Sequence, residues 1–283
     1  MKRREFAAAA TIAVAMPPAF ALMAGVAPDS PSARLDANRT DSPYASVASL
    51  MGGGCYSAVC IAPHFVLTAA HVAAKAPDLF LYLNLGRDLS HRYAIKRVAT
   101  PPPRAKPDPS LPVGDLALLE IDGRLPDGLP LPPLATTPAR EGLRIELAGY
   151  GASGHGDRGV TVGSNPMLKR IGANRIDRVL RSDDASATPL LYYFDFDAAT
   201  PRDGRSLGNG VEAGLASGDS GSPAFVRENG RLALLGINSF VIRSGSATAP
   251  ANGFGTVGGG QVLAAHKAWL HSVLGEGTWA GLA

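Results

Sequence analysis

Three segments of the sequence carry side chains that together could activate a nucleophile. Ser220 lies in the run SGDSGSP at residues 217–223, where a glycine lies close by on each side and favours a sharp turn. A serine hydroxyl is a poor nucleophile near neutral pH, so it needs a base within hydrogen-bond reach and a third group that orients this base. His71 ends the apolar run VLTAAH, and Asp115 opens the apolar run DLALLEI. The three side chains predict nucleophilic catalysis, in the chain order His, Asp, Ser.

Each of these residues would have a separate chemical role. His71 would take the proton of Ser220 and return it to a leaving amine, while Asp115 would hold the tautomer of His71 and stabilise its imidazolium form. Gly218 has no Cβ, so its backbone N–H, with that of Ser220, could point at a developing oxyanion. Taken singly, each residue has an ordinary alternative: a core or surface histidine, an aspartate that forms a turn, and a glycine that serves turn geometry. The combination favours catalysis.

Together the three segments resemble the trypsin/chymotrypsin family of serine peptidases, whose marks are an LTAAH segment, a DLALL-type strand and a GDSG turn. Asp115 lies 44 residues after His71 and 105 residues before Ser220, in the order of that family. The resemblance covers about residues 44–273 and is to exported members of bacterial type. It implies a serine endopeptidase that hydrolyses peptide bonds through an acyl-enzyme intermediate. It implies no cofactor and no metal.

The resemblance also implies residues that contact the substrate. Gly214 matches the base of the primary specificity pocket, Ser239 and Phe240 match a strand that borders the substrate, and Val241 matches the pocket wall. Relatives that cleave after Lys or Arg carry an aspartate where Gly214 stands, so cleavage after small or medium uncharged side chains is expected. Glu212 is an alternative source of negative charge for this pocket, and residues 236–240 could instead form a plain core strand.

Two features depart from the family pattern. Ser222 stands where the motif usually has a second glycine. Relatives that mature by cleavage expose an Ile-Val-Gly-Gly-like terminus, whose amino group pairs with the aspartate just before the nucleophile, here Asp219. No such sequence lies between Pro28 and Leu50. Asp219 is therefore expected to bind a basic side chain, backbone amides or an N-terminus made by signal removal, and activity is expected without a zymogen-type cut.

Residues 1–27 are typical of an export signal. Lys2-Arg3-Arg4 supplies positive charge, an alanine-rich apolar run follows, and Ala19-Phe20-Ala21 offers small residues for cleavage. The mature chain would start near Leu22 or Pro28, in the periplasm or outside the cell, and the RREF sequence resembles the core of a twin-arginine signal. The alternative is an uncleaved membrane anchor, which the two prolines at 17–18 disfavour. Residues 28–43 predict a mobile leader.

From Tyr44 onward, short β-rich runs alternate with glycine and proline turns, which indicates an all-β chain. The family fold adds two packed six-stranded antiparallel β-barrels, with the active site in the cleft between them, and a C-terminal helix. The first barrel would span about 44–124 and the second about 140–260, linked by 125–138. The proline-rich stretch 100–112 predicts an exposed loop before Asp115. The expected strands are 47–50, 59–61, 65–68, 79–85, 93–98, 143–150, 190–196, 224–226, 232–240 and 254–257, with a helix around 261–274.

The composition of the chain limits the partners that we expect for it. The chain has 283 residues, 46% hydrophobic content and a net charge of +3, with basic residues scattered rather than clustered after the N-terminus. Nucleic-acid binding is therefore not expected, and the expected partners are protein or peptide substrates of a monomer that leaves the membrane after signal removal.

Cys55 and Cys60 are five positions apart and would face opposite ways on a strand, so a disulfide would need a turn between them. A packed free Cys60 is the alternative.

Two other classes of protein stay open. An α/β-hydrolase would carry a Gly-x-Ser-x-Gly elbow and the order Ser, acid, His, and both His266 and His271 lie downstream of Ser220. However, no βα alternation surrounds the serine. A catalytically silent relative that serves as a binding protein would share the fold. Such a relative normally lacks a member of the triad, and all three are present.

Overall fold

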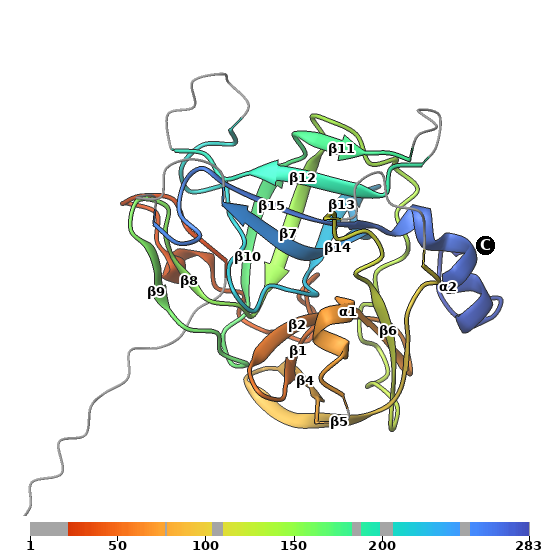
Figure 1. The fold of residues 1–283 in the computed structure, drawn as a ribbon. Coiled ribbons are helices and arrows are strands. Elements are labelled where there is room, and N and C mark those ends of the chain that lie inside the picture. The colour runs from red at the N-terminus through yellow and green to blue at the C-terminus, as the bar shows by residue number, and fades with distance from the viewer. Residues whose placement is uncertain are drawn as a thin grey trace, which may run out of the picture.

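The first half of the chain closes a six-stranded antiparallel barrel with the strand order β1-β2-β3-β6-β5-β4. The computed structural model describes residues 22–76, 78–103, 110–182, 188–198, 206–243 and 250–282. Figure 1 shows this barrel, coloured orange to yellow, below the sheet of the second half. The short helix α1 (Ala70–Ala73) follows β3 directly. The barrel strands are β1 (Val47–Met51), β2 (Cys55–Ala62), β3 (Phe65–Thr68), β4 (Phe80–Leu85), β5 (Asp88–Ala99) and β6 (Ala117–Ile121).

The second half forms a seven-stranded antiparallel sheet in the order β10-β7-β13-β14-β15-β12-β11, with β8 and β9 as a separate hairpin. This confirms the all-β class with two β units, although the second unit is a sheet of seven strands rather than a barrel of six. Four strands were not expected from the sequence: β8 and β9, which lie in a glycine-rich stretch, and β10 and β11, which form the edges of this sheet. Polar residues interrupt the apolar alternation in β10, and β11 has only three residues. The strands are β7 (Arg144–Gly149), β8 (Ser153–His155), β9 (Gly159–Val162), β10 (Arg170–Arg175), β11 (Arg178–Leu180), β12 (Leu191–Asp195), β13 (Pro223–Glu228), β14 (Arg231–Arg243) and β15 (Thr256–Val262).

Apolar side chains fill the barrel because alternate residues of each strand point inward. Leu50, Val66, Leu81 and Leu119 come from four different strands and are fully buried in one cluster. Each such side chain contributes about 1.5–3 kcal/mol through removal from water. β5 shows the complementary pattern, with alternating exposed and half-buried residues along its first half, as expected for a strand with one face in solvent.

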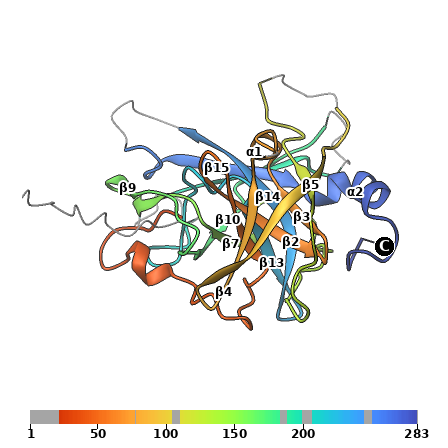
Figure 2. The same cartoon turned by 90° about the horizontal axis from the view of Figure 1, so that it is seen from below.

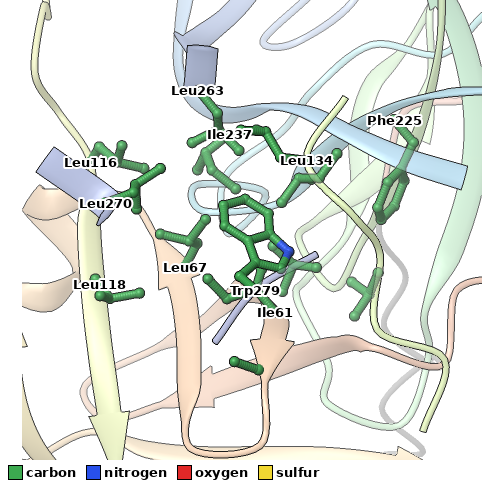
Figure 3. Close-up of a cluster of buried hydrophobic side chains, with 14 of the residues drawn as sticks. Ile61, Leu67, Leu116, Leu118, Leu134, Phe225, Ile237, Leu263, Leu270 and Trp279 are labelled. Carbon is green, nitrogen blue, oxygen red and sulfur yellow. The ribbon is translucent and has the colours of Figure 1, made fainter. Parts of the chain in front are cut away.

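A second cluster joins the barrel, the sheet and the C-terminal segment (Figure 3). It combines Leu67 of β3, Ile237 of β14 and Leu270 of α2 (Lys267–Leu274), which follows the 3-10 turn η2 (Leu263–His266). Trp279 is also buried there, and its Nε1 donates to the carbonyl of Pro132 at 2.7 Å, in the segment that links the two halves. The view in Figure 2 likewise places α2 at the side of the molecule, against both units. The C-terminal helix therefore ties the two halves together.

The segment before the first barrel strand is packed, which differs from the expected mobile leader at 28–43. The 3-10 turn η1 spans Pro31–Arg34, and Arg34 is buried in an ion pair with Asp29. Further along, Asp36 pairs with the fully buried Lys169 at 3.2 Å. These charges lie inside because each has a partner of opposite sign, which offsets the cost of leaving water. Lys169 lies far away in the sequence, as do the carbonyls of Val211 and Glu212 to which Arg34 also donates, so local composition did not reveal these anchors.

Both cysteines are free and buried thiols. They lie on the continuous strand β2, so Cys55 faces the cluster between the two halves and Cys60 faces the barrel core. Of the two alternatives left open by the sequence, the structure has the packed free cysteine. Burial raises the pKa of each thiol to about 12, which leaves both protonated near neutral pH.

Part of the proline-rich loop before Asp115, residues 104–109, lies outside the described residues, as do residues 1–21 of the expected export signal. Over the ranges that the structure describes, no helix has the length and apolar character needed to cross a membrane.

Candidate active site

Asp115 holds His71 through two hydrogen bonds. Oδ1 of Asp115 accepts the backbone N–H of His71 at 2.9 Å, and Oδ2 lies 2.8 Å from Nδ1 of the same residue. With the proton on Nδ1, the other ring nitrogen, Nε2, is left as an acceptor. Asp115 comes from the turn before β6, and His71 from α1 directly after β3, its neighbour in the barrel. The His71 side chain is 45% exposed, against 17% for Asp115, so the ring is open to a ligand.

Ser220 lies on the turn before β13, where the second unit meets the barrel. Its carbonyl accepts the backbone N–H of Ser57 at 3.1 Å. The next residue, Gly221, has a φ of 84°, and a Cβ there would lie 2.1 Å from Oγ1 of Thr68. Only glycine suits that backbone angle and that space. Thr68 is three residues before His71, so this close approach brings the serine turn to the segment that carries the histidine.

Ser220 and His71 are not hydrogen-bonded to each other. Among the described residues, the hydroxyl of Ser220 makes no hydrogen bond to the imidazole. Such contacts are commonly long when no substrate is bound and shorten in the reacting complex.

Two backbone N–H groups of the serine turn make no hydrogen bond within the described part of the chain. The N–H groups of Asp219, Gly221 and Ser222 all donate to backbone carbonyls. In the described part of the chain, those of Gly218 and Ser220 donate to none. An oxyanion hole needs this arrangement, because its donors must stay available for charge that develops in the transition state.

Ser222 fits the turn without disturbing it. Its hydroxyl is fully buried and accepts a hydrogen bond from Nδ2 of Asn238 at 2.9 Å. The side-chain oxygen of Asn238 in turn accepts the hydroxyl of Tyr192 at 2.8 Å. The residue that replaces the usual glycine is thus a member of a satisfied buried network, which stabilises the turn.

The carboxylate of Asp219 is surrounded by backbone amides. It accepts hydrogen bonds from Gly151 at 3.0 Å and Ala216 at 2.9 Å, and the nearby backbone N–H of Leu22 also lowers its pKa. Burial raises its pKa to about 7, which these bonds and the charge of Arg170 only partly offset. Backbone amides were one of the partners expected from the sequence.

Leu22 belongs to an apolar segment inserted into the second unit. Leu22, Met23 and Ala24 are fully buried, and Met23 N–H donates to the carbonyl of Gly214 at 3.0 Å. The run LMAG at residues 22–25 directly follows the small residues at 19–21. Leu22 is one of the two starts expected for the mature chain, and an N-terminus made by signal removal is one of the partners expected for Asp219.

A cavity of about 220 Å³ lies beside Ser220, and its lining includes Leu215, Ser239, Val241 and Asn252. Phe240 also lines it, so three of the four expected substrate-binding residues meet here. The fourth, Gly214, does not line the cavity. Leu215 and Asn252 were not expected, since spacing from the nucleophile does not reveal which loops close a pocket.

Gly214 lies outside the residues that line the cavity. A Cβ at this position would lie 2.7 Å from the ring of Phe196, so the space is already filled. Glu212, the other candidate for a negative charge, is buried, and its carboxylate accepts the N–H groups of Asp197 and Leu207 at 2.7 and 2.6 Å. It is therefore anchored away from the cavity.

Strand β14 leaves one edge open beside the cavity. Its residues up to Ile237 pair with β13, whereas the residues that follow pair, among the described strands, with β15 alone. Ser239 and Phe240 lie in this second stretch, where Phe240 packs against Tyr193 with ring centroids 5.3 Å apart. An open edge has free backbone donors and acceptors that an extended peptide can pair with.

The comparisons with known proteins agree with this architecture. A family model described as the trypsin-like peptidase domain matches residues 56–237. Granzyme M of Homo sapiens is 34% identical over 127 residues, which cover 41% of this chain and 47% of the relative. The chain thus matches about half the length of that curated relative. Because this match is partial, it does not assign the activity of granzyme M to this chain.

A solved structure titled human heparin binding protein shares the fold. The TM-score is 0.57 at 20% sequence identity, and the match covers 86% of this chain and 96% of the other. At this identity the likeness shows the fold alone. The family model spans more than half of the chain and includes His71, Asp115 and Ser220. The chain therefore belongs to the family of trypsin-like peptidase domains.

Proposed function

We propose that this protein is a serine endopeptidase that uses His71, Asp115 and Ser220. The observation that carries the proposal is the pair of hydrogen bonds from His71 to Asp115, together with the two free N–H groups on the turn of Ser220. Family membership supports serine peptidase chemistry in general. The assignment of these three residues is the finer step.

The chemistry follows from the positions of the proton donors and acceptors. His71 Nε2 takes the proton of the Ser220 hydroxyl as Oγ attacks the carbonyl carbon of the scissile bond, and Gly218 and Ser220 N–H bind the resulting oxyanion. The imidazolium then gives its proton to the departing amine, which leaves an ester on Ser220. Water attacks this ester with His71 again as base, the acid product departs, and Ser220 recovers its proton. Asp115 orients the ring throughout.

Substrate recognition would combine the open edge of β14 with the cavity beside Ser220. An extended peptide would add to the edge at Ser239 and Phe240, and its side chain before the scissile bond would enter the cavity. The lining residues include apolar Leu215, Val241 and the neutral amide of Asn252. Asp219 also lines the cavity, but it is 1% exposed and its carboxylate accepts the N–H groups of Gly151 and Ala216. A small or medium uncharged side chain is therefore the proposed preference, since a bound cation would be desolvated without an accessible counter-charge.

Maturation would proceed by removal of the export signal before Leu22. The division into a signal, a connecting segment and a peptidase domain at 44–273 is retained, but the burial of residues 22–24 argues for a cut after Ala21 rather than after Ala27. The mature protein would act as a monomer on exported or external proteins, in the periplasm or outside the cell, with the twin-arginine route as one path of export.

A serine-directed phosphonate probe tests the function. The mature protein should be labelled at Ser220 and should hydrolyse peptide amides, and the Ser220→Ala variant should lose roughly 10⁶-fold in kcat with a nearly unchanged Tm. A folded protein with neither labelling nor hydrolysis would favour the silent binding protein. Ester hydrolysis that depends on His266 or His271, and not on His71, would instead favour the α/β-hydrolase chemistry.

A further inference from the structure

A single barrel residue, Ser57, contacts the serine turn at two points. Ser57 lies on β2 and is fully buried. Its hydroxyl donates to the carbonyl of Gly218 at 3.0 Å and accepts the backbone N–H of Tyr150, also at 3.0 Å. Its own N–H donates to the carbonyl of Ser220 at 3.1 Å. The hydroxyl has one proton to donate, and it donates this proton to the carbonyl of Gly218, whose own N–H is a candidate oxyanion donor.

The bond from Ser57 matters because Gly218 is otherwise easy to rotate. Its φ is 94°, a region open to glycine in which no side chain restrains the backbone. On its N-terminal side, the carbonyl of Ser217 accepts Ala152 N–H at 2.6 Å. In a trans peptide the N–H points opposite to the carbonyl, so this bond turns the Gly218 N–H the other way. On its C-terminal side, the carbonyl of Gly218 itself is held by Ser57.

Both peptide groups that flank the Gly218 α-carbon are thus anchored, the first by Ala152 in the loop between β7 and β8, and the second by Ser57 of the first barrel. Without Ser57, the second peptide would keep only the bond from Asp219 N–H to the carbonyl of Ala216. A tilt of this peptide would move the Gly218 α-carbon and, with it, the direction of the Gly218 N–H. The hydroxyl does not touch substrate or the reacting atoms. Its effect passes through the peptide that it holds.

We propose that Ser57 is a positioning residue for the oxyanion hole. From the first barrel, its hydroxyl holds the peptide of Gly218 in the conformation that binds the oxyanion. This inference rests on the proposed function, because it assigns the orientation of a donor in that same site. It predicts a defect in binding the transition state and not in binding the substrate.

The test compares Ser57→Ala and Ser57→Gly with Ser49→Ala. Ser49 lies directly opposite Ser57 in the β1–β2 ladder and is fully buried, but its hydroxyl faces the carbonyl of Tyr82 and not the serine turn. kcat and KM are measured on a peptide amide. The affinity for a peptide boronic acid, which forms a tetrahedral adduct on Ser220, is measured separately. All are compared at a temperature where circular dichroism shows each variant folded.

Both Ser57 variants should lose about 10- to 100-fold in kcat, somewhat less than the loss of a whole oxyanion donor, with KM changed less than about twofold. Boronic acid affinity should fall by the same factor as kcat, and Ser49→Ala should keep both values within about twofold. Folded Ser57 variants with wild-type kcat, or an equal loss in Ser49→Ala, would overturn the inference and leave the proposed function intact. A wild-type protein that neither hydrolyses the peptide nor binds the boronic acid would overturn both.

Discussion

The backbone N–H of Leu22 lies close enough to the carboxyl of Asp219, the residue directly before Ser220, to lower its pKa. Asp219 is 1% exposed and Leu22 is fully buried, so this approach lies in the interior behind the serine turn. A cut between Ala21 and Leu22 would turn this N–H into an α-ammonium group at the same place. The carboxylate would then gain a charged partner, and the turn that carries Ser220 would be fastened more strongly.

The first prediction is that active protein begins at Leu22. A chain that starts at Ala24 lacks the partner of Asp219, and loss of one member of a buried ion pair costs roughly 3–5 kcal/mol, so we expect it to be much less active. Edman sequencing of the exported protein, with kcat/KM for the chains that start at Leu22 and at Ala24, measures both points. An active exported protein that begins at Pro28 would contradict this prediction.

The second prediction concerns stability against pH in the chain that keeps residues 1–21. Burial raises the pKa of Asp219 from its ordinary 3.8 to about 7 in this form. At pH values between these two pKa values, the folded state keeps a proton on Asp219 that the unfolded state has lost. Stability should therefore fall as the pH rises from about 4 to about 7. In the chain cut before Leu22, the ammonium group favours the ionised carboxylate, and this fall should shrink.

Urea unfolding of both forms at several pH values measures this difference. Asp195, whose pKa burial and the neighbouring Asp177 and Asp197 also raise to about 7, is present in both forms and cancels in the comparison. Identical pH profiles for the two forms would contradict the proposed pairing of Leu22 and Asp219.

The third prediction separates the two roles of Asp115. Asp115→Asn keeps the shape of the side chain but presents an amide to Nδ1 of His71, which favours the wrong tautomer. We expect kcat to fall by about 10⁴-fold, the magnitude known for this triad in other members of the family, with KM little changed. A variant with wild-type kcat near neutral pH would remove Asp115 from the mechanism.

The chemistry of the site was more predictable than its surroundings. His71, Asp115 and Ser220 lie in short runs whose residue types reflect their roles, so the pairing of His71 with Asp115 could be expected from sequence. The pocket lining could not, because Leu215 and Asn252 reach it through loop paths that no local pattern encodes. Likewise the packing of Lys169 against Asp36 depends on a contact between distant segments. The edge strand β10 was missed since its polar residues interrupt the apolar alternation, and β11 since it has only three residues.

The last prediction is that a charge at position 252, and not at position 214, controls cleavage after basic residues. Wild-type protein should prefer small or medium uncharged side chains before the scissile bond, because the neutral Asn252 lines the cavity and Gly214 lies outside it. Asn252 has a φ of 59°, a conformation that aspartate also tolerates. Asn252→Asp gives up the bond from Nδ2 to the carbonyl of Leu215 at 3.3 Å but keeps this backbone conformation. It should thus fold and place a carboxylate against the bound side chain.

We expect Asn252→Asp to raise kcat/KM for a Lys or Arg substrate by about tenfold, which corresponds to ~1.4 kcal/mol. Gly214→Asp is the matched control: it adds the same charge, but its Cβ would lie 2.7 Å from Phe196, so it should destabilise the protein without this gain. A peptide library varied at the residue before the scissile bond, assayed with all three proteins, measures the effect. A wild-type preference for Lys or Arg, or a gain from Gly214→Asp alone, would show that the specificity pocket lies elsewhere, with Gly214 at its base.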